Sequence, residues 1–341
     1  MSKVVDHLAE LTGLRDRDLL DTTLAGALRD LLAPRQVTIL RAVGADNDRR
    51  WLLRAQLGED DVAATSDTVW GDYEELLPLD AEPLRLRCMA QQDVVAVDGA
   101  PALTLFPLFG DRDVAGVVEL RTDAALSSAE MRMVSSMLRV YRNFESVLDY
   151  SERDTLTGLL NRKTFDESFY KSTARLPQSS AGDVRRRDPA RARLPYLAVV
   201  DIDHFKQVND VWGHLIGDEV LLLMSRLMRA CFRFHDLLYR FGGEEFVVLL
   251  RCGGDEDAIK AFERLRQAVQ AYAFPQVGHI TVSVGFTEVR TGDSPSAAFE
   301  RADQAVYWAK KNGRNRVSGF ADLVVKGELN DESKAGDVEL F

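Results

Sequence analysis

The sequence predicts an α+β fold in two domains that a long helix connects. The 341 residues exceed the usual length of one domain, about 100 to 200 residues. Both halves alternate between strand-like apolar runs and helical patterns, and short turn signals between neighbouring strands indicate antiparallel pairing. Hydrophobic residues make up 46% and charged residues 28% of the chain, which is ordinary for a folded globular protein.

Residues 1–125 are predicted to form an antiparallel-sheet domain. A helical pattern over about residues 15–32 precedes two strand-like runs, QVTILRAV and RRWLLRAQL. A helical segment, AEPLRLRCMAQQ, then precedes the strands ALTLFPLF and VAGVVELR, which the turn GDRD connects. The order of these elements resembles a GAF sensory domain, a fold that binds small ligands or forms dimers. We therefore expect this domain to receive an unidentified small-molecule or protein signal.

A long helix is predicted over residues 126–153. Apolar residues recur in it at spacings of three, four, three and four residues, at Val134, Met137, Tyr141, Phe144 and Leu148. This spacing is typical of the seam of a two-stranded coiled coil. An amphipathic helix packed on its own domain gives the same pattern over two heptads. We expect a parallel dimer seam that transmits movement between the domains.

Residues 154–320 form the second predicted domain, which carries acids at two strand ends. One apolar strand, LAVVDID, ends at Asp201 and Asp203. In the stretch YRFGGEEFVVLL, two glycines predict a tight hairpin turn that presents two glutamates at a sheet edge. Acids at the edge of a strand commonly remain solvated at the surface and bind no ligand. Two acidic strand ends can instead hold a hard cation such as Mg²⁺, and with the later stretch AKKNGRN they favour a nucleoside triphosphate site.

Six segments follow one another in the second half of the chain: DTLTGLLNR, DIDHFKQVND, GHLIGDEVL, RFGGEEF, VSVGF and ADQAVYWAKKNGRN. Together they resemble the GGDEF domain, the catalytic module of diguanylate cyclases. The resemblance covers residues 154–319, about half of the chain. It implies a palm-like sheet flanked by helices, and a homodimeric enzyme that condenses two GTP molecules into cyclic di-GMP and two pyrophosphates under control of the first domain.

The resemblance assigns metal binding and catalysis to the acids. Asp201, the main-chain carbonyl of Ile202 and Glu244 would coordinate magnesium at the GTP phosphates. Glu245 would complete a second metal position or help to activate the ribose 3′ hydroxyl. Two Mg²⁺ ions are expected in each active site, with Mn²⁺ as an alternative.

Further residues are implied to bind GTP. Asn209 and Asp218 would hydrogen-bond the guanine edge, and adenine would be rejected because it leaves a buried acid unpaired. The phosphates would contact basic side chains, main-chain amides at a helix start and the two turn glycines. These residues are Lys206, Lys310, Arg314, Phe205, Gly242 and Gly243.

A second site is predicted just before the GGEEF signature. Arg233 and Asp236 form an R-x-x-D pattern in RFHDLLYRFGGEEF. Arginine offers forked donors to phosphate and guanine, and aspartate accepts from guanine. The resemblance implies that this pattern, with Arg264 from the segment FERLR, forms an inhibitory site for the product cyclic di-GMP. An ordinary surface ion pair is the alternative.

Charge and cysteine content argue against several classes of protein. The formal net charge of −11 disfavours a general nucleic-acid or anionic-membrane binder. No apolar run approaches the roughly 18 residues of a membrane span, and MSKVVDHLAELTG lacks the apolar core of a signal peptide. We therefore expect a cytoplasmic protein without membrane insertion. Cys88, Cys231 and Cys252 are odd in number and widely spaced, which predicts reduced structural thiols.

Two segments depart from the family pattern. Residues 175–195, RLPQSSAGDVRRRDPARARLP, are predicted to form an exposed loop. Residues 321–341 are acidic and are predicted to form a disordered tail. Because both signature acids and the guanine contacts are intact, an active enzyme is favoured over the alternative, a catalytically silent cyclic di-GMP receptor.

Overall fold

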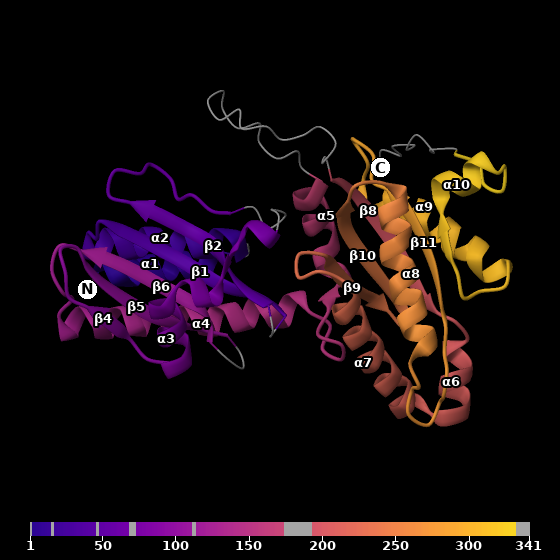
Figure 1. The fold of residues 1–341 in the computed structure, drawn as a ribbon, viewed down its shortest axis with the longest axis horizontal. Helices are drawn as coiled ribbons and strands as arrows, with labels where there is room; N and C mark the ends of the chain where they lie inside the picture. The colour runs from indigo at the N-terminus through magenta and orange to yellow at the C-terminus, as the bar shows by residue number, and fades with distance from the viewer. Residues whose placement is uncertain are drawn as a thin grey trace. The chain divides into compact units, whose positions relative to one another are not determined.

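The computed structural model describes residues 2–14, 17–45, 48–67, 73–110, 114–173 and 193–331. The chain divides into two compact units, Met1–Ser151 and Glu152–Phe341 (Figure 1). The helix predicted as a separate connection is α4 (Ser128–Glu152), and it belongs to the first unit. Within the described ranges, no helix combines the length and the apolar character that a membrane crossing requires.

Some predicted features lie outside the described residues. They are most of the GDRD turn, most of the loop predicted over residues 175–195, and the last ten residues of the predicted tail, that is, residues 111–113, 174–192 and 332–341.

The first unit is built on a six-stranded antiparallel sheet in the order β3-β2-β1-β6-β5-β4. Its strands are β1 (Gln36–Ala45), β2 (Asp48–Gly58), β3 (Leu77–Pro78), β4 (Val95–Val97), β5 (Ala102–Phe109) and β6 (Val114–Thr122). Its other helices are α1 (Ser2–Gly13), α2 (Arg17–Leu32), α3 (Pro83–Gln91) and the short 3₁₀ turns η1 (Tyr73–Glu75) and η2 (Leu79–Ala81). The predicted strands and the α2 and α3 helices are confirmed, whereas α1, β3 and β4 were not predicted.

Both faces of this sheet are covered. Side chains of α1, α2 and α4 pack on one face, where Leu24, Ile39 and Met137 share a core with residues of β2, β5 and β6. Helix α3 covers part of the other face, where Trp51 and Cys88 are buried in a smaller core. The Cys88 thiol is therefore a packed structural group, as predicted, and burial raises its pKa to about 12.

The predicted coiled-coil seam of α4 faces its own sheet. Val134, Met137, Tyr141 and Leu148 are buried in the core of the first unit, and Phe144 packs against that core. These side chains cannot also form a seam with a second copy. The coiled-coil prediction is therefore wrong along this face, and the alternative interpretation, an amphipathic helix on its own domain, is correct.

A buried network of charged groups also holds α4 on the sheet. Asp21 of α2, which is 1% exposed, accepts hydrogen bonds from Arg54 at 2.8 Å and from the Tyr141 hydroxyl. Arg41 of β1 donates to the Tyr141 hydroxyl at 2.6 Å and to Glu145 at 2.7 Å. Burial alone would lower the pKa of Arg41, but Tyr141 and the two carboxylates hold it above its ordinary value. The network thus connects α2, β1, β2 and α4.

The second unit contains a six-stranded sheet in the order β12-β11-β8-β10-β9-β7. Its strands are β7 (Leu160–Asn161), β8 (Leu194–Ile202), β9 (Leu237–Gly242), β10 (Glu245–Cys252), β11 (Val282–Glu288) and β12 (Val317–Gly319). The pairs β7·β9 and β11·β12 are parallel and the other pairs are antiparallel. Strand β8 therefore lies inside the sheet, between β10 and β11.

Helices cover both faces of this second sheet. They are α5 (Phe165–Thr173), α6 (Phe205–Trp212), α7 (His214–Cys231), α8 (Asp255–Ala271), α9 (Pro295–Lys311) and α10 (Phe320–Val325), with a short 3₁₀ turn, η3 (Arg162–Thr164). Along β8, Ala198 and Val200 face the core under α6, α7 and α8, whereas Leu197 and Val199 face the core under α5 and α9. Burial on both faces explains the continuous apolar run in the sequence.

The start of the predicted disordered tail is folded. Helix α10 buries Phe320 and Leu323 against Ala305 of α9, and the Trp308 indole donates to Glu328 at 3.2 Å. The prediction of disorder is therefore wrong up to residue 331. The acidic composition of this segment obscured Leu323, which packs with Phe320, the last residue of the predicted domain, and so helps to anchor one short helix.

Candidate active site

The GGEE segment forms the predicted hairpin turn between β9 and β10. Gly242 and Gly243 have φ angles of +148° and +50°, a conformation that glycine adopts easily because it lacks a Cβ. A Cβ added to either glycine would meet no atom within 4 Å. The turn therefore borders open space, where another group can approach the main chain.

Adjacent strand ends bring the predicted metal-binding residues together. Glu245 of β10 pairs with Asp201 of β8 in the sheet register, and the Ile202 amide donates to the main-chain oxygen of Glu244 at 3.4 Å. Asp201 is 4% exposed, whereas Glu244 is half-buried and Glu245 is exposed. One sheet edge therefore gathers all four residues.

Lys310 of α9 lies against this acidic group, with its Nζ 2.7 Å from Asp201 Oδ2. Burial raises the pKa of Asp201, the charges of Glu245 and Asp203 add to this shift, and Lys310 opposes it. Burial also raises the pKa of Glu244, where Asp201 adds to the shift and Lys310 again opposes it. The acids form a crowded negative site that one lysine partly neutralises.

The chemistry of these donors fits Mg²⁺, which prefers carboxylate and carbonyl oxygens. In the described part of the chain, no three acids converge into a ready-made metal site. The Lys310 ammonium pairs with the buried Asp201 carboxylate, so this sheet edge already holds one positive group. Asp201, Glu244 and Glu245, with the Ile202 carbonyl, are the residues that can hold Mg²⁺.

Asp203 differs from Asp201, although both acids follow the same apolar strand. Its carboxylate accepts hydrogen bonds from Thr281 Oγ1 at 2.6 Å, Ser283 Oγ at 2.7 Å and the Asn315 amide at 3.0 Å. It is also buried, with 4% exposure. Asp203 therefore connects the end of β8 to β11 and to the segment after α9, and it stabilises the framework of the site.

The residues predicted to bind guanine lie where α6 meets α7. A Cβ added to Gly217 of α7 would approach Asn209 Oδ1 to 2.0 Å, so the Asn209 side chain of α6 occupies the space that this glycine leaves. Gly217 directly precedes Asp218, which brings the two predicted guanine contacts close together. Asp218 is exposed. No sequence pattern indicated a role for Gly217.

The three predicted phosphate-binding side chains lie at helix ends. Lys206 is exposed on the first turn of α6, which starts at the buried Phe205. Lys310 lies on the last turn of α9, and Arg314 follows in a turn with a φ of +60° and an amide that donates to the Ala309 carbonyl at 3.0 Å. Of the three, only Lys310 forms an ion pair with the acids in the described part of the chain.

No sequence pattern indicated the link between the hairpin and the opening turn of the domain. Arg240 of β9 contacts Asp154 Oδ1 at 3.1 Å and donates to the Gly243 carbonyl at 3.0 Å. Burial alone would raise the pKa of Asp154, but hydrogen bonds from Thr157 and Arg240 hold it below its ordinary value. The D-x-x-T pattern, a common side-chain-capped turn, is the signal that would have identified Asp154 as an anchor.

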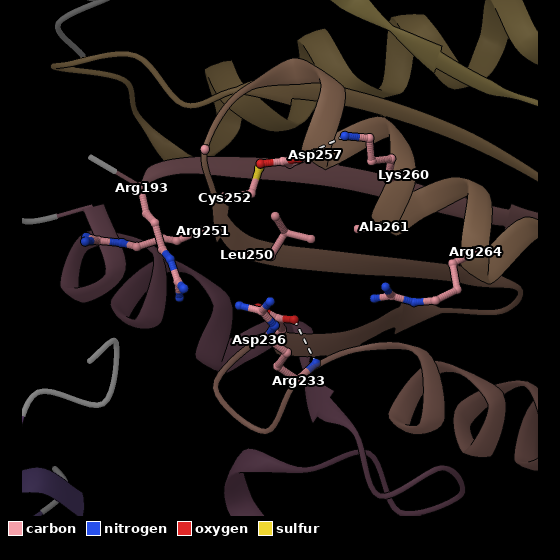
Figure 2. A pocket seen from close by; sticks show the side chains of 11 residues that line it. Arg193, Arg233, Asp236, Leu250, Arg251, Cys252, Asp257, Lys260, Ala261 and Arg264 are labelled. Atoms are coloured by element: carbon pink, nitrogen blue, oxygen red, sulfur yellow. Dashed lines mark hydrogen bonds and ion pairs between the residues drawn. The ribbon is translucent and has the colours of Figure 1, made fainter. Parts of the chain in front are cut away.

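The residues of the predicted inhibitory site line one pocket of about 320 Å³ (Figure 2). Arg233 and Asp236 come from the segment before β9, and Arg264 comes from α8. The Arg233 amide donates to Asp236 at 2.8 Å, and Arg264 Nε donates to the Cys231 carbonyl at 3.0 Å. Burial raises the pKa of Asp236 to about 6, and the nearby arginines oppose this shift. The pocket therefore combines arginines with a partly desolvated acid.

Comparison with known protein families decides what the second unit is. Residues 151–316 match the family model described as diguanylate cyclase, GGDEF domain. The second unit is a GGDEF domain. Its sheet, its signature hairpin and its order of motifs agree with the resemblance inferred from the sequence. Asp201, Glu244 and Glu245 all lie in this domain.

Two curated relatives with the name diguanylate cyclase match about half of the chain. Diguanylate cyclase DgcP of Pseudomonas aeruginosa is 41% identical over 196 residues, which is 55% of this chain and 27% of that protein. Diguanylate cyclase DgcZ of Escherichia coli K12 is 38% identical over 169 residues, 49% of this chain and 52% of that protein. The chain thus spans about a quarter to a half of the length of these relatives.

A solved structure also resembles the GGDEF half. It is the GGDEF domain of DgcB from Caulobacter crescentus in complex with c-di-GMP, which is 33% identical to this chain. The similarity covers 50% of this chain and 96% of that one, with a TM-score of 0.44.

Proposed function

We propose that the protein is a diguanylate cyclase, which condenses two GTP molecules into cyclic di-GMP and two pyrophosphates. One observation carries the proposal: the buried Asp201 carboxylate, the paired Glu245 and the Lys310 ammonium lie together beside an open double-glycine turn. This arrangement suits a metal-bound triphosphate lying against the main chain. The relatives named diguanylate cyclase support the same reaction.

In this proposal, the acids organise the phosphates. Mg²⁺ bound by Asp201, Glu244, Glu245 and the Ile202 carbonyl would supply positive charge for the entering and leaving oxygens of the transfer. Lys310 would exchange its contact with Asp201 for the β- and γ-phosphates. Burial disfavours the ionised forms of Asp201 and Glu244, so a bound cation would stabilise these two carboxylates most.

Other residues would orient the nucleotide. Asn209 and Asp218 would hydrogen-bond the guanine edge, whose N1–H and amino group are donors that adenine does not present in the same way. Lys206 and Arg314 would complete the phosphate contacts. The open main-chain turn would let the α-phosphate approach closely, since any side chain there would occupy that space.

The reaction requires two GGDEF domains to face each other. The 3′ oxygen of one GTP attacks the α-phosphorus of the second GTP, and pyrophosphate leaves. Because one domain offers one set of nucleotide contacts, a homodimer is the proposed catalytic assembly. The α4 face used by the first unit's core does not contribute to that dimer.

The first unit is proposed to be a GAF-like regulatory domain. Its antiparallel sheet, covered by α1, α2 and α4 on one face and by α3 on the other, is compatible with this family. Helix α4 ends at Glu152, and the opening turn of the GGDEF domain starts at Asp154. A small ligand or partner that altered the packing of α4 would therefore act on the start of the catalytic domain.

Product formation from GTP tests the proposed reaction. The purified full-length protein is incubated with GTP and Mg²⁺ at several protein concentrations, and the nucleotides are separated by chromatography. We expect cyclic di-GMP, formed at a specific rate that increases with protein concentration because the active form is a dimer. Binding of cyclic di-GMP with no turnover, even after the Arg233→Ala substitution removes product inhibition, would support the receptor alternative and contradict the proposal.

Arg233→Ala is expected to weaken product inhibition. The substitution removes charge-assisted hydrogen bonds to phosphate or guanine, so we expect the cyclic di-GMP concentration for half-inhibition to rise about 10-fold to 100-fold. The measurement is the initial rate of pyrophosphate release at increasing concentrations of added cyclic di-GMP. Arg226→Ala on α7 removes an arginine outside the pocket and is the matched control. Equal inhibition of the Arg233 variant and the wild type would contradict the inhibitory-site assignment.

Product binding is expected to weaken as the pH falls through about 6. Burial raises the pKa of Asp236 to about 6, and the carboxyl must be ionised to accept from guanine. The affinity should therefore be constant at higher pH and should decrease below pH 6 as this group takes up a proton. The measurement is the dissociation constant for cyclic di-GMP, determined by calorimetry between pH 5 and 8.

Other charged groups near Asp236 could also affect product binding, so the pH profile requires a control variant. Arg193, Arg233 and Arg264 stay charged throughout this range. His235 Nε2 lies 3.8 Å from Asp236 Oδ1, so a variant must show which group causes the change. The Asp236→Asn variant should remove the decrease, and a decrease of unchanged size in that variant would contradict the assignment.

A further inference from the structure

The inhibitory pocket carries more positive charge than the predicted motif accounts for. Arg233 and Arg264 belong to that motif, whereas the remaining cationic side chains of the pocket are Arg193, Arg251 and Lys260. Its two acidic side chains are Asp236 and Asp257. A single phosphate does not need five cationic neighbours. The excess suggests that the pocket binds a ligand with more than one anionic group.

Arg193 and Arg251 occupy one side of the pocket. Figure 2 shows them on one side of Asp236 and Arg264 on the other side. Arg193 is close enough to Asp236 to lower the pKa of its carboxyl, as Arg233 and Arg264 also do. The Asp236 carboxylate thus lies among three arginines. One of them, Arg193, directly precedes β8 and lies far in sequence from the R-x-x-D pattern.

Arg251 is held in place by the protein main chain. It lies on β10 next to Leu250, another pocket residue. Its guanidinium donates to the Ser172 carbonyl of α5 from Nε at 3.1 Å and also from Nη2. Burial lowers the pKa of Arg251, which means that its charge is partly desolvated. A fixed, partly desolvated guanidinium binds phosphate more strongly than a mobile surface side chain because less ordering and desolvation remain.

We propose that Arg193 and Arg251 form a second phosphate-binding arm of this pocket, in addition to Arg233 and Arg264. The ligand class is a nucleotide with two phosphodiester groups. Cyclic di-GMP, the product under the proposed function on which this inference rests, is such a ligand. With Arg193 and Arg251 on one side of Asp236 and Arg264 on the other, a single domain would contact both anionic groups, and the central acid would accept the hydrogen bonds of a guanine between them.

Calorimetric titration of the full-length protein with cyclic di-GMP tests the second arm. The variants are Arg193→Gln and Arg251→Gln, which keep a polar side chain and remove the positive charge. We expect each of them to raise the dissociation constant about 10-fold or more, the usual effect of losing a charge-assisted hydrogen bond. Arg193→Lys should restore only part of the affinity, because an ammonium group lacks the forked donors of a guanidinium.

Lys260→Gln is the matched control for charge. Lys260 lines the same pocket, but its side chain is 70% exposed and lies 3.3 Å from Asp257. Its removal lowers the positive charge of the pocket by the same amount and should change the dissociation constant less than about threefold, as for an exposed charge. If Arg193→Gln weakens binding no more than Lys260→Gln does, Arg193 contributes only to the overall positive charge of the pocket. It then does not contact the phosphate, and the proposal is overturned.

Arg251→Gln also removes a main-chain contact, so its thermal unfolding is measured in parallel. The thermal unfolding of Arg193→Gln is measured as well, and a variant that unfolds at the wild-type temperature decides the result. Failure of the second arm is distinguishable from failure of the proposed function. In the first case, the wild type binds cyclic di-GMP and Arg233→Ala weakens binding while Arg193→Gln does not. In the second case, the wild type itself does not bind.

Discussion

Glu245→Gln should reduce cyclic di-GMP synthesis by at least about 10²-fold to 10³-fold, the usual effect of removing one group that stabilises transition-state charge. Glu245 is opposite Asp201 in the sheet register and its side chain is exposed at the open turn. Glutamine keeps the shape of the side chain and removes the negative charge that a metal or the 3′ hydroxyl proton requires. The measurement is the initial rate of product formation from GTP and Mg²⁺.

Two measurements separate a catalytic effect of Glu245→Gln from a structural one. Because the Glu245 side chain is exposed, the variant should unfold within a few degrees of the wild type, as surface substitutions usually do. Glu256→Gln, on the exposed first turn of α8, is the matched control and should keep full activity. Unchanged turnover in Glu245→Gln would remove this residue from the metal and base assignments.

The acidic part of the site was predictable because its residues lie next to each other in strongly patterned segments. The apolar run that ends in Asp201 and the double-glycine turn before Glu245 are both local signals. Antiparallel pairing of β8 with β10 then brings the two acids together. These two local signals therefore suffice to predict that the acids meet at a sheet edge, without the remaining topology.

The supporting contacts were not predictable, because each joins residues that are distant in sequence. Asp203 and Asp201 are equivalent in the pattern, and only the hydrogen bonds from Thr281 and Ser283 separate their roles. Arg240 reaches Asp154 across 86 residues. No local periodicity predicts such a pair, because the sequence around an arginine does not show whether its side chain is exposed or paired.

The α4 prediction failed for a different physical reason. Repeated apolar residues at spacings of three and four define one face of a helix, but they do not identify what covers that face. In this protein the sheet of the first unit covers it. The polar residues between the apolar positions held the missing information, because Glu145 lies on the same helix as Tyr141 and is buried in the charged network.

Asp21→Ala should destabilise the first unit by about 3–5 kcal/mol, the usual cost of removing one partner from a buried ion pair. Asp21 is 1% exposed and accepts from Arg54 and Tyr141, and Arg41 lies 3.6 Å away. Its removal leaves two partly buried guanidinium groups with less negative charge beside them. Alanine also lacks an acceptor for the Tyr141 hydroxyl.

Hydrogen exchange of the full-length protein measures this effect on α4 separately from the GGDEF domain, because it resolves local opening segment by segment. Asp30→Ala is the matched control: Asp30 lies on the same α2 helix, its side chain is 52% exposed, and its loss should cost at most about 1 kcal/mol. Equal protection of α4 in the two variants would mean that apolar packing alone holds this helix. A selective loss of protection would instead show that the charged network stabilises α4.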